Sequence, residues 1–407
     1  MRCGLLGKKL GHSYSPQIHA NFGDYSYELF EKAPEELGDF LQNGNFIGLN
    51  VTIPYKRDVL PYCTELSDRA KTLGAVNTIV RRSDGTLVGH NTDYFGFQSM
   101  LKRSGLVVRG KKVLVLGSGG ASVTAVAALK EQSANVIVIS RSGVNNYCNI
   151  QDHADASVIV NATPVGMYPN VGVSPVDLDM FPKLEGVLDI VYNPARTQLL
   201  LDAEKKGLIV DNGLWMLVAQ AKESAEWFTG SKISDSKIGE IHSVLRRQME
   251  NIVLIGMPGC GKSTIGMLLS EKLCRKFVDA DAEIIKLAGK SIPEIFTESG
   301  VEGFRKYETE VLDLLGKQSG LVIATGGGCV TRAENYAHLH QNGRIVWIMR
   351  DISSLPTDGR PLSQQNKLEQ MYAIRKPMYE AFADICVMND REPNLVAEQI
   401  MIQEGYR

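Results

Sequence analysis

The glycine-rich segment from Gly256 to Thr264 has the residue types and spacing of a phosphate-binding loop. It reads GMPGCGKST, follows an apolar strand and precedes a helical run, which is the context of the pattern G-x-x-x-x-G-K-[ST]. The loop amides would cradle phosphates, Lys262 would reach the β- and γ-phosphates, and Ser263 would hold Mg²⁺. The predicted nucleotide-binding residues are Gly259, Cys260, Gly261, Lys262, Ser263 and Thr264.

A second glycine loop occurs earlier, in the stretch KKVLVLGSGGASVTAVAALK, where a strand runs into Gly117–Gly120 and then into a helix. Such a loop offers helix N–H groups to a pyrophosphate, but the same residues also fit an ordinary tight turn. The next strand ends in Ser140-Arg141-Ser142, without the acidic residue that binds a ribose 2′-hydroxyl. An arginine between two hydroxyls suits a 2′-phosphate, so NADP is favoured over NAD.

Four polar clusters precede this second loop. They are GHSYSP (11–16), NVTIPYK (50–56), GAVNT (74–78) and NTD (91–93). Small neutral donors and acceptors of this kind suit a polyhydroxylated ligand, and Lys56 with Asp93 would make a proton-transfer pair. By composition alone, however, clusters of Asn, Ser and Thr are more often turns and helix caps.

The region after Thr264 carries charged residues that suit an acceptor with a carboxylate and hydroxyl groups. Arginine forks bind carboxylates, an aspartate accepts from hydroxyls, and glycine amides allow close approach. These residues are Asp279, Asp281, Arg305, the triple glycine Gly326-Gly327-Gly328, Arg360 and Arg375. Each arginine taken singly would more often be a surface charge.

Short apolar runs predict the elements that must position these residues. They are continuous rather than alternating and are separated by helical segments, which indicates parallel sheets covered on both faces. The clearest are Val113–Leu116, Val136–Ser140, Ser157–Asn161, Gly186–Val191, Leu208–Val210, Ile252–Ile255, Leu321–Ala324 and Ile345–Ile348. The sequence therefore predicts an α/β protein with two doubly wound units, joined near Met249 by a helix over Ser236–Glu250.

Composition limits the class of protein. A chain of 407 residues, 44% hydrophobic and 22% charged, is an ordinary globular protein of two or three domains. The 44 Lys and Arg nearly balance the 46 Asp and Glu, so nucleic acid is not an expected partner. The 7 cysteines form no C-x-x-C pair, and no apolar run approaches the roughly 18 residues of a membrane helix. We therefore expect a cytoplasmic protein without a zinc site.

Eight motifs in order resemble those of the shikimate dehydrogenase family, over about residues 3–248. They are HSYSP, NVTIPYK, GAVNT, NTDYFG, GSGGAS, NATPVGM, DIVYNP and GLWMLVAQ. The resemblance implies reduction of 3-dehydroshikimate with NADPH. It also implies an α/β substrate domain at about 1–100 plus 213–249 and a Rossmann-like NADP domain at about 101–212, within a dehydrogenase part spanning 1–249.

The resemblance carries roles onto individual residues. Lys56 and Asp93 match the catalytic pair, and Ser13 and Ser15 match the serines that bind the substrate carboxylate. The other matched substrate contacts are Thr52, Asn77, Tyr192 and Gln220. The matched cofactor residues are Gly117, Ser118, Gly119, Gly120, Ala121, Ser140, Arg141, Ser142, Asn161, Thr163, Met167 and Gly213.

Residues 250–407 resemble the shikimate kinase family, a P-loop fold with a parallel sheet. The resemblance makes Lys262 and the lid arginine Arg360 catalytic, and it places Ser263 and Asp279 at Mg²⁺. It also implies that Glu308 orients Arg305. The residues implied to contact shikimate are Asp281, Arg305, Gly326, Gly327, Gly328 and Arg375.

The leading hypothesis is a bifunctional enzyme of aromatic amino acid biosynthesis, acting on small molecules as a monomer or homodimer. It would reduce 3-dehydroshikimate to shikimate with NADPH, then phosphorylate shikimate with ATP and Mg²⁺. One alternative is a quinate/shikimate dehydrogenase that prefers NAD, fused to a kinase. Another is a regulatory ligand-binding protein with one inactive site.

Overall fold

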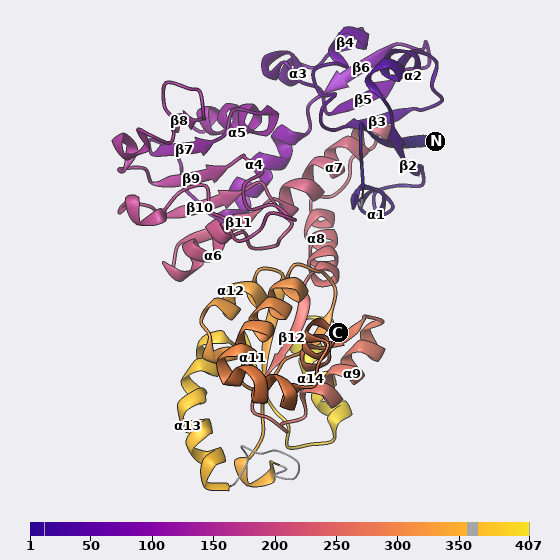
Figure 1. The fold of residues 1–407 in the computed structure, drawn as a ribbon. Helices are drawn as coiled ribbons and strands as arrows, with labels where there is room; N and C mark the ends of the chain where they lie inside the picture. Colours follow the sequence, from indigo (N-terminus) through magenta and orange to yellow (C-terminus); the bar gives the residue numbers. More distant parts are fainter. Residues whose placement is uncertain (12, 356–364, 407) are drawn as a thin grey trace. The chain divides into compact units, whose positions relative to one another are not determined.

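The described part of the chain contains three β-sheets that follow one another along the sequence (Figure 1). The computed structural model describes residues 1–11, 13–355 and 365–406. The first sheet has the strand order β2-β1-β3-β5-β6-β4. Its strands are β1 (Arg2–Gly7), β2 (Ser26–Glu31), β3 (Gly48–Val51), β4 (Glu65–Leu66), β5 (Thr78–Arg81) and β6 (Leu87–His90). The helices of this region are α1 (Ser15–His19), α2 (Leu37–Asn43) and α3 (Asp68–Leu73).

Antiparallel pairing in the first sheet aligns three of the four polar clusters. Strand β5 runs antiparallel to both β3 and β6, so Asn50 lies opposite Thr78 and Thr78 lies opposite His90. The turn from β5 to β6 is short because Gly85 adopts a φ of +87°, which L side chains rarely adopt. The parallel pairing predicted from the apolar runs therefore does not extend to this sheet, which is mixed.

The second sheet is parallel throughout, with the order β11-β10-β9-β7-β8. Its strands are β7 (Lys112–Leu116), β8 (Asn135–Ile139), β9 (Val158–Asn161), β10 (Gly186–Asp189) and β11 (Ile209–Asn212). Helices α5 (Gly120–Glu131) and α6 (Gln198–Lys205) occur between its strands in the sequence. Because β7 pairs with β8 on one side and β9 on the other, the strand order reverses at β7, the position where such sheets bind ligands.

The third sheet is also parallel, with the order β13-β14-β12-β15-β16. Its strands are β12 (Asn251–Ile255), β13 (Phe277–Asp279), β14 (Val322–Ala324), β15 (Gly343–Met349) and β16 (Ile385–Met388). The helices of this region are α9 (Lys262–Leu273), α10 (Ala280–Ala288), α11 (Ile292–Gly316), α12 (Glu334–His340), α13 (Gln365–Phe382) and α14 (Pro393–Gln403). Val253, Leu254 and Ile255 of the central strand are fully buried. Successive residues of a strand face opposite sides, so their burial means that both faces of the third sheet are covered. The parallel pairing of the second and third sheets confirms the prediction.

Helix α7 (Leu214–Thr229) packs along α4 (Asp93–Ser104), as Figure 1 shows. The two helices approach closely because α4 carries Gly96 at the crossing. A Cβ at this glycine would lie 2.7 Å from the Met216 carbonyl oxygen and 3.0 Å from the Gln220 Cβ. Any side chain at this position would therefore push α7 away from the start of α4.

The chain divides into two compact units. The first comprises Met1–Gly166, Ser174–Tyr192 and Asp202–Val244, and the second comprises Met167–Val173, Asn193–Leu201 and Leu245–Arg407. The division at Val244–Leu245 falls inside α8 (Ser236–Met249), and the domain limits given from the sequence stay a prediction. None of the helices among the described residues has the length and apolar character that a membrane crossing requires.

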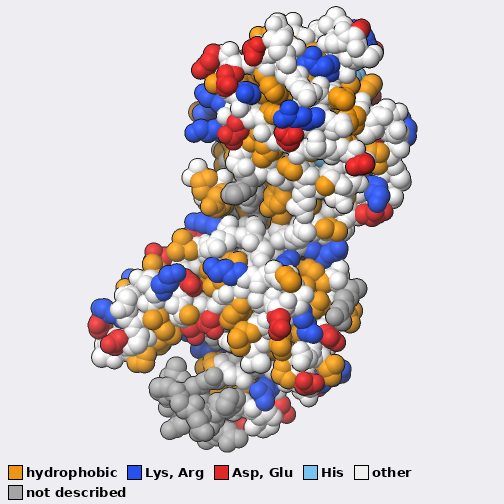
Figure 2. All heavy atoms as spheres, turned by 90° about the vertical axis from the view of Figure 1, so that its right-hand side faces the viewer, with side chains coloured by type: hydrophobic (Ala, Val, Ile, Leu, Met, Phe, Trp, Pro, Cys, Tyr) orange, Lys and Arg blue, Asp and Glu red, His pale blue; other side chains and the backbone are white. Residues whose placement is uncertain are grey.

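The balance of charge in the sequence is also visible on the surface. On the face drawn in Figure 2, blue and red side chains are interspersed with orange ones rather than gathered by sign. This mixture agrees with the near-equal numbers of basic and acidic residues, 44 and 46.

Candidate active sites

Lys56 and Asp93 form an ion pair in the first unit. The Lys56 Nζ lies 2.6 Å from the Asp93 Oδ2, and the side chains are 25% and 13% exposed. Asp93 is the first residue of α4, where the helix dipole stabilises a carboxylate. The pair therefore presents a partly exposed ammonium that a largely buried carboxylate, 13% exposed, holds in place, which is an arrangement suited to proton transfer.

The amide of Asn77 lies beside this pair because β5 and β6 are neighbours. The Asn77 Oδ1 accepts from the backbone N–H of Thr92 at 2.7 Å, and the Asn77 Nδ2 donates to the Thr92 Oγ1 at 3.0 Å. The Thr92 hydroxyl also lies 3.5 Å from the Gln220 Oε1 of α7. The structure thus brings Asn77 and Gln220 to the residue that directly precedes Asp93.

Ser13, Ser15 and Tyr192 gather around the start of α1. The backbone N–H of Ser15 donates to the Ser13 Oγ at 3.2 Å. The neighbouring Tyr14 ring packs edge-on against Tyr192, with 6.5 Å between ring centroids. Burial raises the pKa of Tyr192, so its hydroxyl stays protonated and can donate. Thr52 lies elsewhere, just after β3, where its N–H donates to the Leu6 carbonyl at 2.9 Å.

The glycine loop after β7 leaves open space at the N-terminus of α5. Gly117 has a φ of +104°, and a Cβ there would lie 3.0 Å from the Ala162 carbonyl oxygen. A Cβ at Gly119 or Gly120 would instead meet no atom within 4 Å. The exposed Ser118 and half-buried Ala121 flank these glycines. The open N-terminus therefore fits the pyrophosphate of a dinucleotide, which approaches such helix ends closely.

Asn161 and Gly213, two of the predicted cofactor residues, lie in well-packed surroundings. Asn161 is fully buried. Its Oδ1 accepts hydrogen bonds from the Thr163 backbone N–H at 3.0 Å and from the Thr163 Oγ1 at 2.7 Å, and its Nδ2 donates to the Asp189 Oδ1 at 3.0 Å. A Cβ at Gly213 would lie 1.9 Å from the Ile190 carbonyl oxygen. Both residues therefore shape the loops at the carboxyl edge of the second sheet. Met167 belongs to the second compact unit and is 45% exposed.

The segment Ser140-Arg141-Ser142 directly follows β8. It lies beside the glycine loop, since the Gly117 N–H donates to the Ile139 carbonyl at 2.8 Å. Arg141 is exposed and makes no ion pair with the residues that the structure describes. Its guanidinium is therefore free to meet an anion at this end of the loop.

The phosphate-binding loop of the second unit winds around the Lys262 ammonium. Gly256, Gly259 and Gly261 adopt φ values of +143°, +82° and +102°, which L side chains rarely adopt. The Lys262 Nζ donates to the carbonyls of Gly256 at 2.9 Å and Met257 at 3.1 Å. The loop thereby holds its cation in place at the start of α9.

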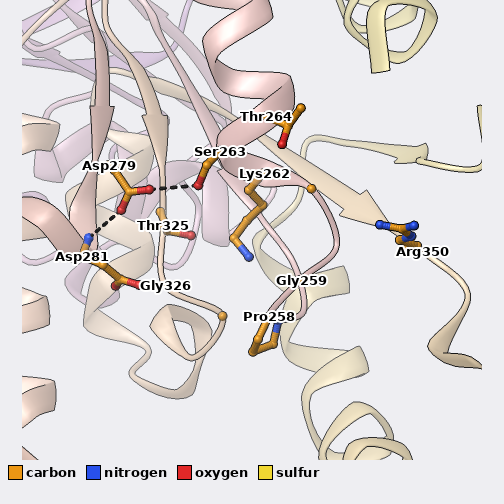
Figure 3. A pocket seen from close by; sticks show the side chains of 12 residues that line it. Pro258, Gly259, Lys262, Ser263, Thr264, Asp279, Asp281, Thr325, Gly326 and Arg350 are labelled. Carbon is orange, nitrogen blue, oxygen red and sulfur yellow. Dashed lines mark hydrogen bonds between the residues drawn. The ribbon is translucent and has the colours of Figure 1, made fainter. Parts of the chain in front are cut away.

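A cavity of about 440 Å³ opens in front of this loop (Figure 3). Its lining residues are Pro258, Gly259, Gly261, Lys262, Ser263, Thr264, Asp279, Asp281, Thr325, Gly326, Gly327 and Arg350. The Ser263 Oγ donates to the Asp279 Oδ2 at 2.9 Å. A hydroxyl and a carboxylate in contact beside the loop are oxygen ligands of the type that Mg²⁺ takes. Cys260 does not line the cavity, because its side chain is fully buried.

The charged residues predicted for an acceptor meet at the triple glycine. The Arg305 Nη1 lies 2.5 Å from the Glu308 Oε2, and Glu308 is fully buried. A Cβ at Gly328 would lie 1.9 Å from the Arg305 Nη2, and one at Gly326 would lie 3.0 Å from the Asp281 Oδ1. A side chain at Gly328 would therefore shift the Arg305 guanidinium, and one at Gly326 would shift the Glu308 and Asp281 carboxylates.

Asp281 keeps an unused acceptor at this point of the cavity. Its Oδ1 is buried and has no hydrogen-bond partner among the described residues. Burial and the negative charge of Asp279 raise the pKa of Asp281, and burial raises that of Glu308. The Arg375 Nη1 donates to the Gly327 carbonyl at 3.1 Å. Arg360 lies outside the described residues.

Sequence reasoning missed Pro258, Thr325 and Arg350, which also line the cavity. Arg350 directly follows β15, the neighbour of β12, and lies across the pocket from Asp279 in Figure 3. It makes no ion pair with described residues. The sequence could have indicated Arg350 as a ligand contact, because it follows the carboxyl end of a predicted parallel strand and ligands of open α/β sheets bind at that edge.

Comparisons with known proteins agree with this geometry. A family model for the shikimate dehydrogenase substrate binding domain matches residues 5–79, and one for shikimate kinase matches residues 258–403. The chain is 34% identical to a shikimate dehydrogenase (NADP(+)) of Clostridium beijerinckii, over 61% of this chain and 98% of that protein.

Solved structures match the same part of the chain. Shikimate dehydrogenase 1 from Peptoclostridium difficile is 37% identical with a TM-score of 0.56, over 60% of this chain and 97% of its own. A shikimate 5-dehydrogenase from Thermus thermophilus, solved with NADP(H) and shikimate, is 33% identical with a TM-score of 0.55, over 60% and 98%. The chain therefore belongs to the shikimate dehydrogenase family and continues into a shikimate kinase domain.

Proposed function

We propose that the chain catalyses two consecutive reactions on one small cyclic acid. The first unit reduces the ketone of 3-dehydroshikimate to shikimate with NADPH, and the second transfers a phosphoryl group from ATP to a hydroxyl of shikimate. One observation carries this proposal: each part brings its reacting groups together, Lys56 in an ion pair with Asp93 and the phosphate-binding loop lining one cavity with Asp281. The product of the first reaction is the acceptor of the second.

In the first unit, Lys56 acts as the proton donor. When bound, the nicotinamide would supply the hydride that reduces the ketone carbon. The Lys56 ammonium gives a proton to the ketone oxygen as negative charge develops there, and Asp93 holds the ammonium in place. Ser13 and Ser15 bind the substrate carboxylate, while Thr52, Asn77, Tyr192 and Gln220 bind its oxygens.

In the second unit, the loop amides and Lys262 bind the phosphates of ATP. The Lys262 ammonium exchanges the Gly256 and Met257 carbonyls for phosphate oxygens as the nucleotide enters. The unpartnered Asp281 Oδ1 accepts the hydrogen of the attacking hydroxyl, and Arg305 binds the carboxylate of the acceptor. Arg375 takes part in the same carboxylate contact.

Ser263 and Asp279 are the residues that would hold Mg²⁺. When bound, the ion would neutralise charge on the phosphate oxygens. The hydrogen bond between the two side chains places both oxygens at the phosphate-binding loop. Two protein ligands are enough, because Mg²⁺ keeps several waters and substrate phosphates in its shell.

NADP preference rests on Arg141 in this proposal. Arg141→Ala should raise the KM for NADPH roughly tenfold, because an ionic hydrogen bond to the 2′-phosphate is lost. The KM for NADH should stay within about twofold, since NADH lacks that phosphate. Steady-state kinetics with both cofactors measures the ratio, and Lys130→Ala, an exposed change on α5, is the control. Equal effects on both cofactors would reject the role of Arg141.

Arg350 binds the nucleotide phosphates in this proposal, as an unpaired cation at the wall of the cavity. Arg350→Ala should raise the KM for ATP roughly tenfold and leave the KM for shikimate unchanged. Initial rates at varied ATP and varied shikimate separate the two constants. Lys286→Ala, an exposed change on α10, serves as the control. An increase confined to the KM for shikimate would place Arg350 on the acceptor instead.

Product analysis tests the whole proposal. The purified chain is supplied with 3-dehydroshikimate, NADPH and MgATP, and every product is identified by mass spectrometry. Shikimate and its phosphate should both appear, and shikimate alone should accumulate when ATP is omitted. Faster reduction with NADH, or oxidation of quinate in preference to shikimate, would contradict the first half. Shikimate binding without phosphorylation would contradict the second.

A further inference from the structure

We propose that Asn389 is a positioning residue for nucleotide binding in the second unit. Its side-chain amide holds one peptide unit of the phosphate-binding loop, that between Cys260 and Gly261, so that the Gly261 N–H points at a bound phosphate. This inference rests on the proposed use of ATP by the second unit. Neither the motifs of the sequence nor the comparisons assign a role to Asn389.

Asn389 reaches the phosphate-binding loop from the carboxyl edge of the third sheet. It directly follows β16, and its backbone N–H donates to the carbonyl of Met349, the last residue of β15, at 2.7 Å. Its side-chain Nδ2 donates to the Cys260 carbonyl at 2.7 Å. A carbonyl oxygen can only accept, so the amide has one orientation that makes this bond. The sheet thus fixes the backbone of Asn389, and its side chain holds the loop.

This hydrogen bond sets the direction of the next backbone N–H group. The peptide between Cys260 and Gly261 is trans and planar, so its C=O and its N–H point in opposite directions. Gly261 lines the cavity in front of the loop, whereas Asn389 is not among the described lining residues. The Gly261 N–H has no acceptor within the described part of the chain, so it is available to a phosphate oxygen.

Other contacts hold the peptide units on either side of this one. The Cys260 N–H donates to the Met257 carbonyl at 3.2 Å, which fixes the preceding peptide unit. The Gly261 carbonyl accepts from the Ile265 N–H at 3.0 Å, which fixes the following one. Among the residues that the structure describes, only Asn389 donates to the Cys260 carbonyl. The orientation of this peptide unit therefore depends on the Asn389 amide.

Glycine at position 261 makes such a hold necessary. Gly261 has a φ of +102°, and glycine adopts positive and negative φ about equally well. Rotation of the peptide between Cys260 and Gly261 is therefore not prevented by the loop itself, and it would turn the N–H away from the phosphate. A Cβ at Gly261 would lie 2.4 Å from the Asn389 Nδ2, so a bulkier residue cannot replace this glycine while the amide is in place.

The test is Asn389→Ala in the full chain. The affinity for ADP, measured by calorimetry, should fall roughly five- to tenfold, because one hydrogen bond to a phosphate is no longer held in place. The affinity for inorganic tripolyphosphate should fall by the same factor, since this probe carries phosphates without a base or a ribose. In the kinase assay the KM for ATP should rise by that factor, while the KM for shikimate stays within about twofold.

Asn251→Ala is the matched control. The Asn251 Nδ2 also donates to a backbone carbonyl of the second unit, that of Gln318 at 2.8 Å, but it lies at the start of β12 and outside the cavity. This variant should lower the melting temperature and leave the affinity for ADP unchanged. If Asn389→Ala fails to fold, Asn389→Leu decides, because leucine has the shape of asparagine without its donor and should show the same loss.

An unchanged affinity for ADP in a folded Asn389 variant would overturn the inference. A loss confined to ADP, with tripolyphosphate bound as before, would also overturn it, because Asn389 would then contact the base or the ribose directly. An unaltered chain that binds ADP but does not phosphorylate shikimate would contradict the proposed function instead. The binding measurements would still decide the role of Asn389, so the two failures are distinguishable.

Discussion

Replacing Lys56 with alanine should abolish reduction of 3-dehydroshikimate while phosphorylation of added shikimate continues at the unaltered rate. The expected fall in kcat for reduction is roughly 10²- to 10⁴-fold, the contribution of a positioned general acid. The Lys56 Nζ is the partly exposed end of a pair with Asp93 at 2.6 Å, so its loss removes the proton donor and leaves a carboxylate in the site. NADPH oxidation and ATP consumption, assayed separately, measure the two rates.

A second lysine in a similar ion pair provides a control for loss of activity that comes only from loss of stability. Lys112 also forms an ion pair in the first unit, with Asp155 at 2.5 Å, and its side chain is 22% exposed. Lys112→Ala should therefore alter stability as Lys56→Ala does, but it should retain reduction. A Lys56→Ala protein that still reduced the ketone at more than a tenth of the normal rate would exclude Lys56 as the donor.

Replacing Lys262 with alanine should have the opposite result. Phosphoryl transfer should fall roughly 10²- to 10³-fold, because the cation that stabilises charge on the transferred phosphates is gone. Reduction should be unchanged, since Lys262 lies in the second compact unit. Phosphate incorporated into shikimate and NADPH oxidation are the two measurements.

Lys272→Ala is the control for this change, because Lys272 lies in the same helix and pairs with Glu398 at 3.2 Å outside the cavity. Its kinase activity should match that of the unaltered chain. Loss of both activities in a folded Lys262→Ala protein would show that the two sites do not work independently.

The sequence predicted best those parts of the fold that depend on local pattern. Every apolar run named from the sequence became a strand, because continuous Val and Ile runs are stable only inside a covered parallel sheet. The individual strands of the first sheet and their mixed pairing were not predicted, although the resemblance implied an α/β domain there. Its strands are short and partly polar, as in β2 and the two-residue β4, and its antiparallel pairing depends on partners distant in sequence.

For the candidate sites too, the sequence predicted what depends on local motifs, and it did not predict what depends on contacts between distant segments. Motifs identified Lys56, Asp93 and the phosphate-binding loop, and the structure brings each set into contact. Motifs could not show that Asn161 is fully buried and hydrogen-bonded to Thr163 and Asp189. They also could not identify the hydrogen bond between Asn50 and Ser224 of α7, because the two residues lie more than a hundred positions apart in the sequence.

The pairing of β3, β5 and β6 has a consequence for how this part of the chain can change length. Successive side chains of a strand point to opposite faces, so one residue inserted within β5 would turn Thr78 away from Asn50 and remove the alignment with His90. An insertion at Asp84 or Gly85, in the turn beyond the strand ends, would leave that alignment intact. Natural variation in length should therefore accumulate at this hairpin tip and be excluded from the strands a few residues away.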